Sequence, residues 1–319
     1  MCYSAQIIHD YRRYVRTFGA DIDLREFVDL FWRRRTDPKV KVPKAMELAF
    51  SDPQNEEQRM IRMLIEEHAA DQTVRWEQDL FKQRKRKADA ERALQSKPTK
   101  AAAESLRIAI NKIEAAMGKL ADMRRTELID DDCRIYPGYY APVLVVENGR
   151  RVVKPMRYQC RPAGKPAFYD TKYPGTYNAR RDNLQGFWKG IFGYSHGITV
   201  VNAFYENVNL HRVQGRELAE GEEVQNAVLE FRPRPTQDML VACLWSRSIL
   251  PGEPELLSFA AITDEPPPEV SAAGHDRCII PLRPENIDAW LNPDPRRLGD
   301  LYAILDDRER PYYEHRLAA

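Results

Sequence analysis

Residues 143–153 read Val-Leu-Val-Val-Glu-Asn-Gly-Arg-Arg-Val-Val, so that Asn148 and Gly149 separate two runs rich in β-branched residues. Both turn residues tolerate positive φ angles, and the pattern therefore predicts a β-hairpin with a two-residue turn. Strand-like apolar runs follow at 197–204, 239–245, 256–262 and 278–280. Because few helical segments separate these runs, the sequence predicts an α+β body built on antiparallel sheet, not alternating βαβ units.

A different composition fills residues 39–132, where Ala, Glu, Lys, Arg and Gln dominate and glycine is nearly absent. Asp52-Pro53 is typical of a helix start, and the pattern continues to about Ser96, which is roughly 65 Å of helix. Lys97-Pro98-Thr99 ends the helix, because proline does not fit in a helix interior. In the return segment, apolar residues alternate steps of four and three, which predicts a packed heptad seam of Leu106, Ile110, Ile113, Met117 and Leu120.

These two segments predict an antiparallel helical hairpin over residues 39–132, inserted into a body formed by residues 1–38 and 133–319. On the first arm, residues 82–87 read Lys-Gln-Arg-Lys-Arg-Lys, which is either a solvated face or a surface for duplex DNA or a partner protein. Within the body, residues 21–35 carry apolar side chains at helical spacing and predict an amphipathic helix.

The composition is that of a folded protein, with 43% apolar and 30% charged residues in a chain of 319. No apolar run reaches ~18 residues and no basic-then-apolar leader is visible, so neither a membrane span nor secretion is expected. The five cysteines are odd in number and none forms a C-x-x-C pair, which argues against a disulfide scaffold or a zinc site. The net charge of +1 means that any nucleic-acid binding must come from a local basic patch.

The chain begins Met1-Cys2-Tyr3-Ser4. Removal of Met1 would leave a cysteine with an α-amine and a thiol two carbons apart, and both groups have reference pKa values of roughly 8. Such a pair suits an aldehyde, because the amine forms an imine and the thiol then closes a five-membered thiazolidine in an intramolecular step. A cysteine at position 2 is also common without any function, so this interpretation depends on the rest of the chain.

Three polar residues lie where strand ends are expected to converge. Glu206 closes the apolar run 198–205, and burial there would raise the pKa of its carboxyl group toward a range useful for acid–base catalysis. His275 lies just before the run 278–280, and Asn178 follows a Pro-Gly turn, where its amide could hold an amine or imine nitrogen. Each also has an ordinary explanation: a surface glutamate, a structural histidine, and an asparagine that caps a turn.

Several segments follow one another in a recognisable order after the Met-Cys start: Arg134-Ile135-Tyr136-Pro137, Met156-Arg157-Tyr158, Tyr177-Asn178-Ala179-Arg180, Val201-Asn202-Ala203-Phe204-Tyr205-Glu206, Leu240-Val241-Ala242-Cys243-Leu244-Trp245 and His275-Asp276-Arg277-Cys278-Ile279-Ile280-Pro281. This order resembles the SRAP family, the SOS response-associated peptidases that crosslink to abasic sites in DNA. The resemblance covers residues 1 to about 20 and about 133–293. It implies an antiparallel, barrel-like β body with peripheral helices, to which the helical hairpin is an addition.

The resemblance also implies a role for each matched residue. Cys2 would form the thiazolidine with the ring-opened aldehyde of an abasic site, while Asn178 holds the α-amine. Glu206 would move protons in imine formation and ring closure, and His275 would protonate the sugar oxygen as the ring opens. Removal of Met1 by the chain itself and an abasic-site lyase activity are implied as well. DNA contacts are implied for Arg180, through a backbone phosphate, and for Arg181, Arg157, Tyr158 and Thr263.

The implied partner is single-stranded DNA that contains an abasic site. No cofactor is expected, and the expected location is the cytoplasm, on the nucleoid when DNA is bound. The family's tryptophan after Met-Arg is replaced here by Tyr158, and residues 159–164 read Gln-Cys-Arg-Pro-Ala-Gly in place of a Gly-Leu-Ile-Pro-x-Trp stretch. These changes remove aromatic side chains that could stack on bases, and Phe168, Tyr169 or Tyr173 are candidates to replace them.

Two other classes of function stay open on the sequence alone. In an N-terminal-nucleophile amidohydrolase, Cys2 would attack an amide with its own amine as the base, but this class needs an oxyanion hole, which the sequence does not locate. In a non-catalytic scaffold, the helical hairpin would be the working part.

Overall fold

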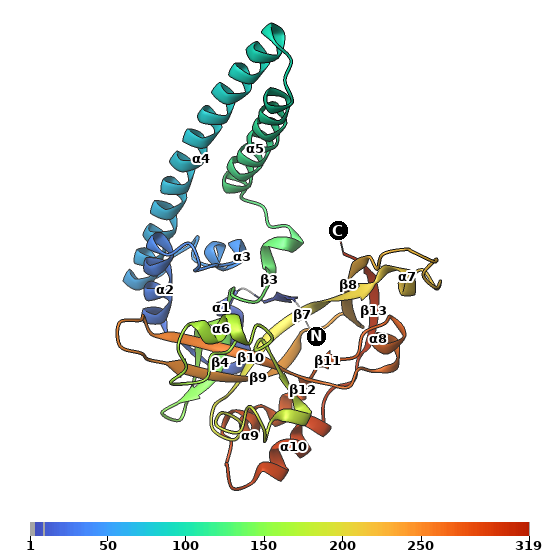
Figure 1. Ribbon diagram of the computed structural model, residues 1–319. Helices are drawn as coiled ribbons and strands as arrows, with labels where there is room; N and C mark the ends of the chain where they lie inside the picture. Colours follow the sequence, from blue (N-terminus) through green and yellow to red (C-terminus); the bar gives the residue numbers. More distant parts are fainter. Residues whose placement is uncertain (1–3, 9, 319) are drawn as a thin grey trace. The chain divides into compact units, whose positions relative to one another are not determined.

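The computed structural model describes residues 4–8 and 10–318, and Cys2 therefore lies outside the described residues. The chain folds into two compact units. The first, here called the β body, combines the residues up to Asp52 with those from Ile129 onward, and the second, the helical hairpin, runs from Pro53 to Leu128 (Figure 1). The domain limits expected at residues 39 and 132 stay a prediction.

The helical hairpin consists of two long helices, α4 (Glu56–Ser96) and α5 (Lys100–Arg124), on either side of the predicted break (Figure 1). Helix α4 begins later than predicted, because Asn55 rather than Asp52 caps it: the Asn55 side chain accepts a hydrogen bond from the Gln58 N–H over 2.9 Å. Helix α5 is capped in the same way, by the hydroxyl of Thr99.

The packed seam of the helical hairpin differs from the predicted heptad. Its buried residues include Gln83 and Ala90 on α4 and Ala109 and Ala116 on α5, so that each arm contributes two buried positions seven residues apart. Met117, which was expected in the seam, is 51% exposed. Leu120, also expected in the seam, is buried with 7% exposure, and alanine at the other two buried positions of α5 allows the helices to approach closely.

The β body is built on one large mixed sheet with short helices around it (Figure 1). Its strands are β1 (Ser4–Ile7), β2 (Asp21–Ile22), β3 (Arg134–Ile135), β4 (Tyr140–Glu147), β5 (Arg150–Tyr158), β6 (Asn178–Arg180), β7 (His196–Asn209), β8 (Asn226–Arg234), β9 (Met239–Ser248), β10 (Leu256–Asp264), β11 (Cys278–Ile279), β12 (Pro281–Leu282) and β13 (Tyr312–Leu317). Its helices are α1 (Tyr11–Phe18), α2 (Leu24–Thr36), α3 (Lys44–Leu48), α6 (Phe168–Lys172), α7 (Leu210–Val213), α8 (Pro268–Ala272), α9 (Ile287–Leu291) and α10 (Leu298–Asp306). Across residues 4–8 and 10–318, no helix combines the length and apolar character that a membrane span requires.

The predicted β-hairpin of residues 143–153 is present. Strands β4 and β5 pair with Glu147 opposite Arg150, and Asn148 and Gly149 have φ angles of 51° and 74°. These positive angles fit the tight turn that the Asn-Gly pair indicated. The other predicted apolar runs lie within β7, β9, β10 and β11, and the α+β class is confirmed.

The sheet is mixed, and it is not a true barrel. Most pairs are antiparallel as predicted, but β2–β5, β10–β5 and β10–β6 are parallel. Long chain segments separate the partners of each parallel pair, so no tight turn forces them to run in opposite directions. The pairings lead from β9 through β10, β5, β4 and β7 back to β9, yet the β4–β7 link is one residue pair, Leu144 with Ile198, and further strands branch from this ring.

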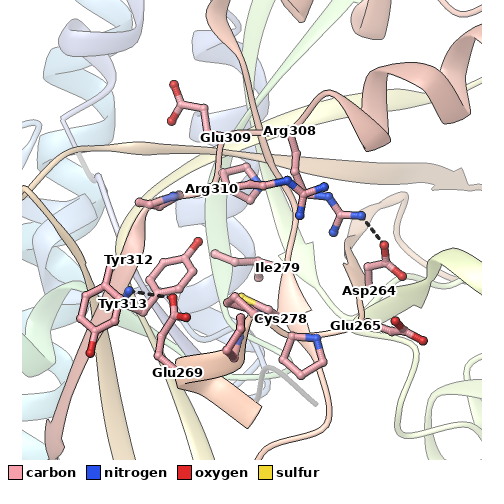
Figure 2. Close-up of a pocket in the computed structure, with 15 residues that line it drawn as sticks. Asp264, Glu265, Glu269, Cys278, Ile279, Arg308, Glu309, Arg310, Tyr312 and Tyr313 are labelled. Atoms are coloured by element: carbon pink, nitrogen blue, oxygen red, sulfur yellow. Dashed lines mark hydrogen bonds and ion pairs between the residues drawn. The ribbon is translucent and has the colours of Figure 1, made fainter. Parts of the chain in front are cut away.

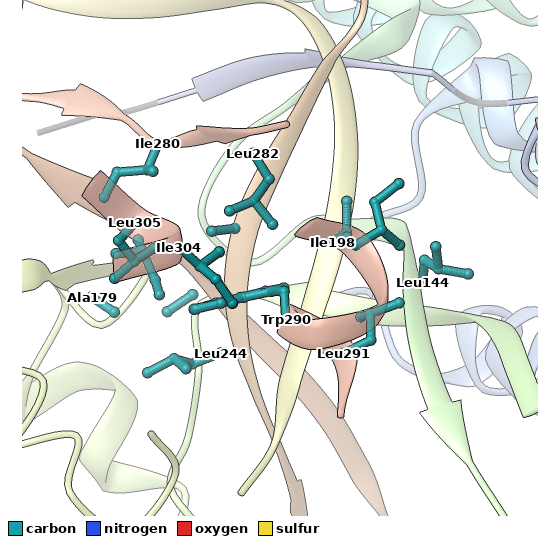
Figure 3. Close-up of a cluster of buried hydrophobic side chains, with 14 of the residues drawn as sticks. Leu144, Ala179, Ile198, Leu244, Ile280, Leu282, Trp290, Leu291, Ile304 and Leu305 are labelled. Carbon is teal, nitrogen blue, oxygen red and sulfur yellow. The ribbon is translucent and has the colours of Figure 1, made fainter. Parts of the chain in front are cut away.

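A hydrophobic core lies against the central strands, with Trp290 of α9 at its centre (Figure 3). The indole of Trp290 is fully buried, and its Nε1–H donates to the carbonyl oxygen of Gly197 on β7 over 3.0 Å. Ile198, Leu244 and Leu282 are also fully buried, on β7, β9 and β12. This core fixes the strand β7, which carries the first residue of the site described next.

Candidate functional site

A buried carboxyl group and a buried imidazole meet beside strand β7. Glu206 lies in the last third of β7 and is 0% exposed. His275 follows Gly274, whose φ of 95° favours glycine, and it is 8% exposed. The Nε2 atom of His275 lies 3.0 Å from Oε2 of Glu206. The structure thus brings together two of the residues predicted from sequence, from segments about 70 positions apart.

The second ring nitrogen of His275 limits where its protons lie. Nδ1 is 2.9 Å from the carbonyl oxygen of Arg277 and 3.4 Å from the Arg277 backbone nitrogen, and in the tautomer with a hydrogen on Nδ1 the ring donates to that carbonyl. A hydrogen bond between Nε2 and Glu206 then needs one further proton, held by either the carboxyl group or the imidazole. Burial lowers the pKa of His275 from its ordinary value, and the Arg277 carbonyl offsets part of that shift. Such a pair can hold a proton or pass it on.

Asn178 begins strand β6, which pairs in parallel with β10 so that Asn178 lies opposite Ala261. Its side chain is held below the surface, with the residue 6% exposed. The hydroxyl of Tyr158 donates to its side-chain oxygen over 3.5 Å. Because the hydroxyl of Tyr158, at the end of β5, engages the oxygen of the amide, it helps to set the orientation of the Asn178 side chain.

Thr263 lies on the part of β10 that connects β6 with the segment of His275. It is paired with Arg180 of β6 on one side and with Ile279 of β11 on the other. The residue is 1% exposed, and within the described part of the chain its hydroxyl oxygen has no hydrogen-bond partner. A buried hydroxyl without a hydrogen-bond partner is costly in a folded protein. A polar group of a ligand bound at this position would supply the missing hydrogen bond.

Strand β1 brings the start of the described chain to the same place. Ser4 is fully buried and pairs with Tyr205, the residue before Glu206. Arg134 of β3 donates to the Ser4 hydroxyl over 2.9 Å, and its guanidinium lies 3.7 Å from the ring centre of Tyr205. Arg134 was part of a matched segment, but no role for it followed from that segment alone. The structure shows that it fixes the first residues of β1 on β7.

The two arginines after Asn178 differ in their surroundings. Arg180 has a 48% exposed side chain, and its Nε–H donates to Asp182 over 2.9 Å. An exposed pair of this kind contributes little and can exchange for another anion. Arg181 is engaged with Asp306 at 2.5 Å and with Asp264 at 3.7 Å. Of these two predicted DNA contacts, Arg180 is therefore the more available cation.

Arg157 and Tyr158, also predicted to contact DNA, are held inside the β body. Arg157 is 2.8 Å from Asp170, and its guanidinium also donates to the carbonyl oxygen of Gln159. Tyr158 is 3% exposed, and its ring packs against Tyr177 and Phe259. Both side chains position their neighbours in this structure, and their contact with DNA stays a prediction.

A second buried group beside Glu206 was not anticipated. Burial raises the pKa of the Cys278 thiol far above its usual range, and the nearby Glu206 carboxylate raises it further. Cys278 also lines a cavity of about 560 Å³, together with Asp264, Arg308 and Tyr313 (Figure 2). Asn178, Glu206 and His275 are not among the residues that line this cavity.

In residues 4–8 and 10–318, no cluster of His, Cys, Asp or Glu is arranged to hold a metal ion.

Comparisons with known proteins agree with the order of the segments. The sequence model of the family described as "SOS response associated peptidase (SRAP)" matches residues 91–316. No curated protein sequence matches the chain.

Solved structures with a similar fold come from structural genomics. A Bordetella bronchiseptica protein is 18% identical with a TM-score of 0.46, covering 61% of this chain and 90% of its own. A Bacteroides thetaiotaomicron protein is 13% identical with a TM-score of 0.46, covering 60% and 80%. A phage-related protein from Bordetella bronchiseptica is 16% identical with a TM-score of 0.43, covering 61% and 85%.

Proposed function

This chain belongs to the SRAP family, and we propose that it detects abasic sites in single-stranded DNA and becomes covalently linked to them through Cys2. The product is a thiazolidine formed from the α-amine and thiol of Cys2 and the ring-opened aldehyde of the sugar. The same site removes Met1, which exposes the α-amine. An abasic-site lyase activity would follow from the imine intermediate of the same reaction.

The observation that supports this proposal best is the contact of 3.0 Å between His275 Nε2 and Glu206 Oε2. The reaction needs a group that gives and takes protons several times in a site sheltered from water. His275 would protonate the sugar ring oxygen as its bond to C1′ breaks. Glu206 would protonate the hydroxyl that leaves as water when the amine nitrogen forms the imine, and would receive a proton when the thiol sulfur adds to the imine carbon.

Cys2 lies outside the described residues, and its part in the proposal rests on the strand that it precedes. Ser4, two positions later, pairs with Tyr205, the neighbour of Glu206. Two residues span at most about 7 Å, so the proposal requires a nucleophile at position 2 that stays this close to Ser4, on the strand paired beside Glu206. Arg134 holds Ser4 in that register, which keeps the start of β1 from moving away.

Asn178 would bind the α-amine of Cys2, and Arg180 would bind the DNA backbone. The Asn178 amide would accept from or donate to the α-amine, which keeps the nitrogen directed at the aldehyde carbon. The exposed guanidinium of Arg180, which binds both carboxylate oxygens of Asp182, would exchange that contact for a phosphate of the DNA backbone, which accepts the same bidentate geometry. Thr263, whose buried hydroxyl has no hydrogen-bond partner among residues 4–8 and 10–318, would donate to the sugar or phosphate that enters beside Arg180.

The test uses the full chain after removal of Met1, incubated with a single-stranded oligonucleotide that carries one abasic site. We expect a slower band that survives heat and denaturant on a gel, and its loss in Cys2→Ala. Cys133→Ala is the matched control, because Cys133 is a half-buried cysteine that lies outside the Glu206–His275 site. Amide hydrolysis without a slower band would favour an N-terminal-nucleophile amidohydrolase. Absence of both activities would contradict a catalytic role and favour a scaffold.

A further inference from the structure

Three aromatic side chains form a partly exposed cluster close to Asn178 in sequence. The ring centres of Tyr169 and Tyr173 are 4.3 Å apart, and Phe187 lies 6.3 Å from Tyr169 and 6.1 Å from Tyr173. Tyr173 is 37% exposed and Phe187 is 38% exposed. We call these three residues the aromatic platform. Large aromatic rings in mutual contact that still face solvent are unusual on a protein surface and indicate a binding role.

The aromatic platform is held rigidly from below. Asp170 of α6 accepts from Arg157 over 2.8 Å and from Arg161 over 2.6 Å, which ties the helix to the sheet. Arg161 is also 2.9 Å from Glu253, which lies in the loop between β9 and β10. Because the ion pairs lie mostly below the surface, they fix α6 more firmly than an exposed pair would.

The third ring is fixed by a separate set of contacts. Trp188, 3% exposed and part of the core, packs against Phe187 with ring centres 4.9 Å apart. The Asn183 side chain accepts from the Phe187 N–H over 3.1 Å. A Cβ at Gly186 would lie 2.2 Å from the same Asn183 oxygen, so the turn has room only for glycine unless that hydrogen bond breaks. The platform is therefore organised before any ligand arrives.

Two lysines lie beside rings of the aromatic platform, within a segment that is basic in sequence. Residues 162–190 contain five basic side chains and two acidic ones, in a protein whose net charge is +1. Both acidic groups, Asp170 and Asp182, are engaged with arginines. Lys165 lies 5.9 Å from the ring centre of Tyr169, and Lys172 lies 5.4 Å from that of Tyr173. Lysine is depleted at protein–protein interfaces, whereas lysines between exposed rings are typical of surfaces that bind single-stranded nucleic acid.

We propose that the aromatic platform is a base-stacking surface for single-stranded DNA, which holds bases of the strand that enters the Glu206–His275 site. This rests on the function proposed above and names how this chain grips undamaged nucleotides. The chain from Tyr173 to Asn178 folds in two tight turns, with Thr176 N–H donating to the Tyr173 carbonyl and Asn178 N–H to that of Gly175. Five residues span at most about 17 Å, so the platform contacts nucleotides near the abasic one.

The experiment measures equilibrium binding of the full chain to an undamaged, fluorescent oligothymidine of roughly 12 nucleotides. Tyr173→Leu and Phe187→Leu keep an apolar side chain but remove the flat ring, and each is expected to weaken binding about 5- to 30-fold. Trp32→Leu is the matched control, because Trp32 is 61% exposed on α2 and belongs to no ring contact of the platform. Its affinity should not change.

A second pair of variants leaves the rings intact. Lys165→Gln and Lys172→Gln should each reduce the slope of log affinity against log salt by about 0.7, the value for one phosphate contact on a single strand. Unchanged affinity in the ring variants, with folding verified by thermal melting, would overturn the proposal even if the lysine variants bind more weakly. Binding of a protein to the aromatic platform, together with unchanged DNA affinity in Tyr173→Leu and Phe187→Leu, would overturn it too.

The two proposals fail separately, because undamaged DNA offers no aldehyde. If the unaltered chain binds oligothymidine through the platform but forms no adduct with abasic DNA, the crosslinking function is wrong and the platform stands. If adducts form at the same rate in the ring variants and binding to undamaged DNA is unchanged, the platform is wrong and the crosslinking function stands.

Discussion

Two buried histidines of the β body, His196 in the core and His275 beside Glu206, have different partners. His196 is 2% exposed, accepts from the Gly193 N–H over 2.9 Å and contacts the Trp290 carbonyl oxygen at 3.1 Å. Burial lowers its pKa to about 3, and it lowers the pKa of His275 as well. Burial alone therefore does not distinguish a structural histidine from a reactive one.

The partner of the ring makes the difference. Both contacts of His196 are to backbone groups, which neither accept nor release a proton, so the ring stays neutral and serves packing. His275 also contacts a backbone carbonyl, but its other nitrogen meets Glu206, which can exchange a proton with it. The reactivity of a buried histidine thus depends on an ionisable neighbour. We therefore expect opposite phenotypes for substitutions at the Glu206–His275 pair and at His196.

The largest effect is expected for Glu206→Gln. The amide keeps the shape of the side chain but cannot transfer a proton, so the rate of adduct formation should fall about 10²- to 10⁴-fold while the melting temperature changes little. His275→Ala should have a similar effect. The double variant should be little slower than either single one, because the two groups act as a unit. Rate losses that multiply would mean that Glu206 and His275 act independently.

The reverse pattern is expected for His196→Phe. The change removes two hydrogen bonds and leaves the Gly193 N–H and the Trp290 carbonyl buried without partners, which should lower the free energy of unfolding by about 2–4 kcal/mol. Urea unfolding measures this loss. Adduct formation per folded molecule should be unchanged, and a large rate loss in this variant would contradict a purely structural role for His196.

The pH dependence of stability gives a smaller effect of known sign. The unfolded chain protonates His196 below about pH 6.5, whereas the folded protein resists protonation down to about pH 3. The stability from the neutral ring is present above the unfolded pKa and is lost as the pH falls, at about 1.4 kcal/mol per pH unit. Between about pH 5.5 and 4.5, where the unfolded chain has His196 almost fully protonated, His196→Phe should show a slope shallower by that amount. An equal slope would contradict the assigned partners.

The smallest effect concerns Arg180, which lies at the edge of the site. Arg180→Ala should reduce the slope of log affinity for single-stranded DNA against log salt by about 0.7, with little effect on stability. Arg150→Ala is the matched control, because Arg150 is also exposed and paired with an aspartate but lies at the β4–β5 turn. An unaltered slope for Arg180→Ala would remove its phosphate contact from the account.

The sequence predicted those features that depend on local pattern. The Asn148-Gly149 turn and the apolar runs of β7, β9 and β10 follow from residue type and spacing, and the structure contains them. The parallel pairing of β10 with β5 and β6 could not be predicted, because it depends on how distant segments meet. For the same reason, Met117 was expected in the seam of the helical hairpin but is exposed, whereas Ala109 and Ala116 are buried together with the predicted Leu120.

For the site, the sequence identified Glu206 and His275 as separate candidates, and only the fold shows their contact. It also suggested that Phe168, Tyr169 or Tyr173 could stack on bases. It gave no indication that Phe187 completes the cluster, because that contact joins α6 with a later turn. The burial of Arg157 by Asp170 was equally hidden, since a basic residue next to an aromatic one is typical of both a surface and a packed interior.

The most direct test of the central claim is mass spectrometry of the protein after incubation with abasic single-stranded DNA and digestion of both polymers. We expect an adduct on the N-terminal peptide, with Met1 absent and the sugar joined to Cys2 with loss of one water. An adduct on a lysine or on another cysteine, or an N-terminal peptide that keeps Met1 and carries no sugar, would contradict it.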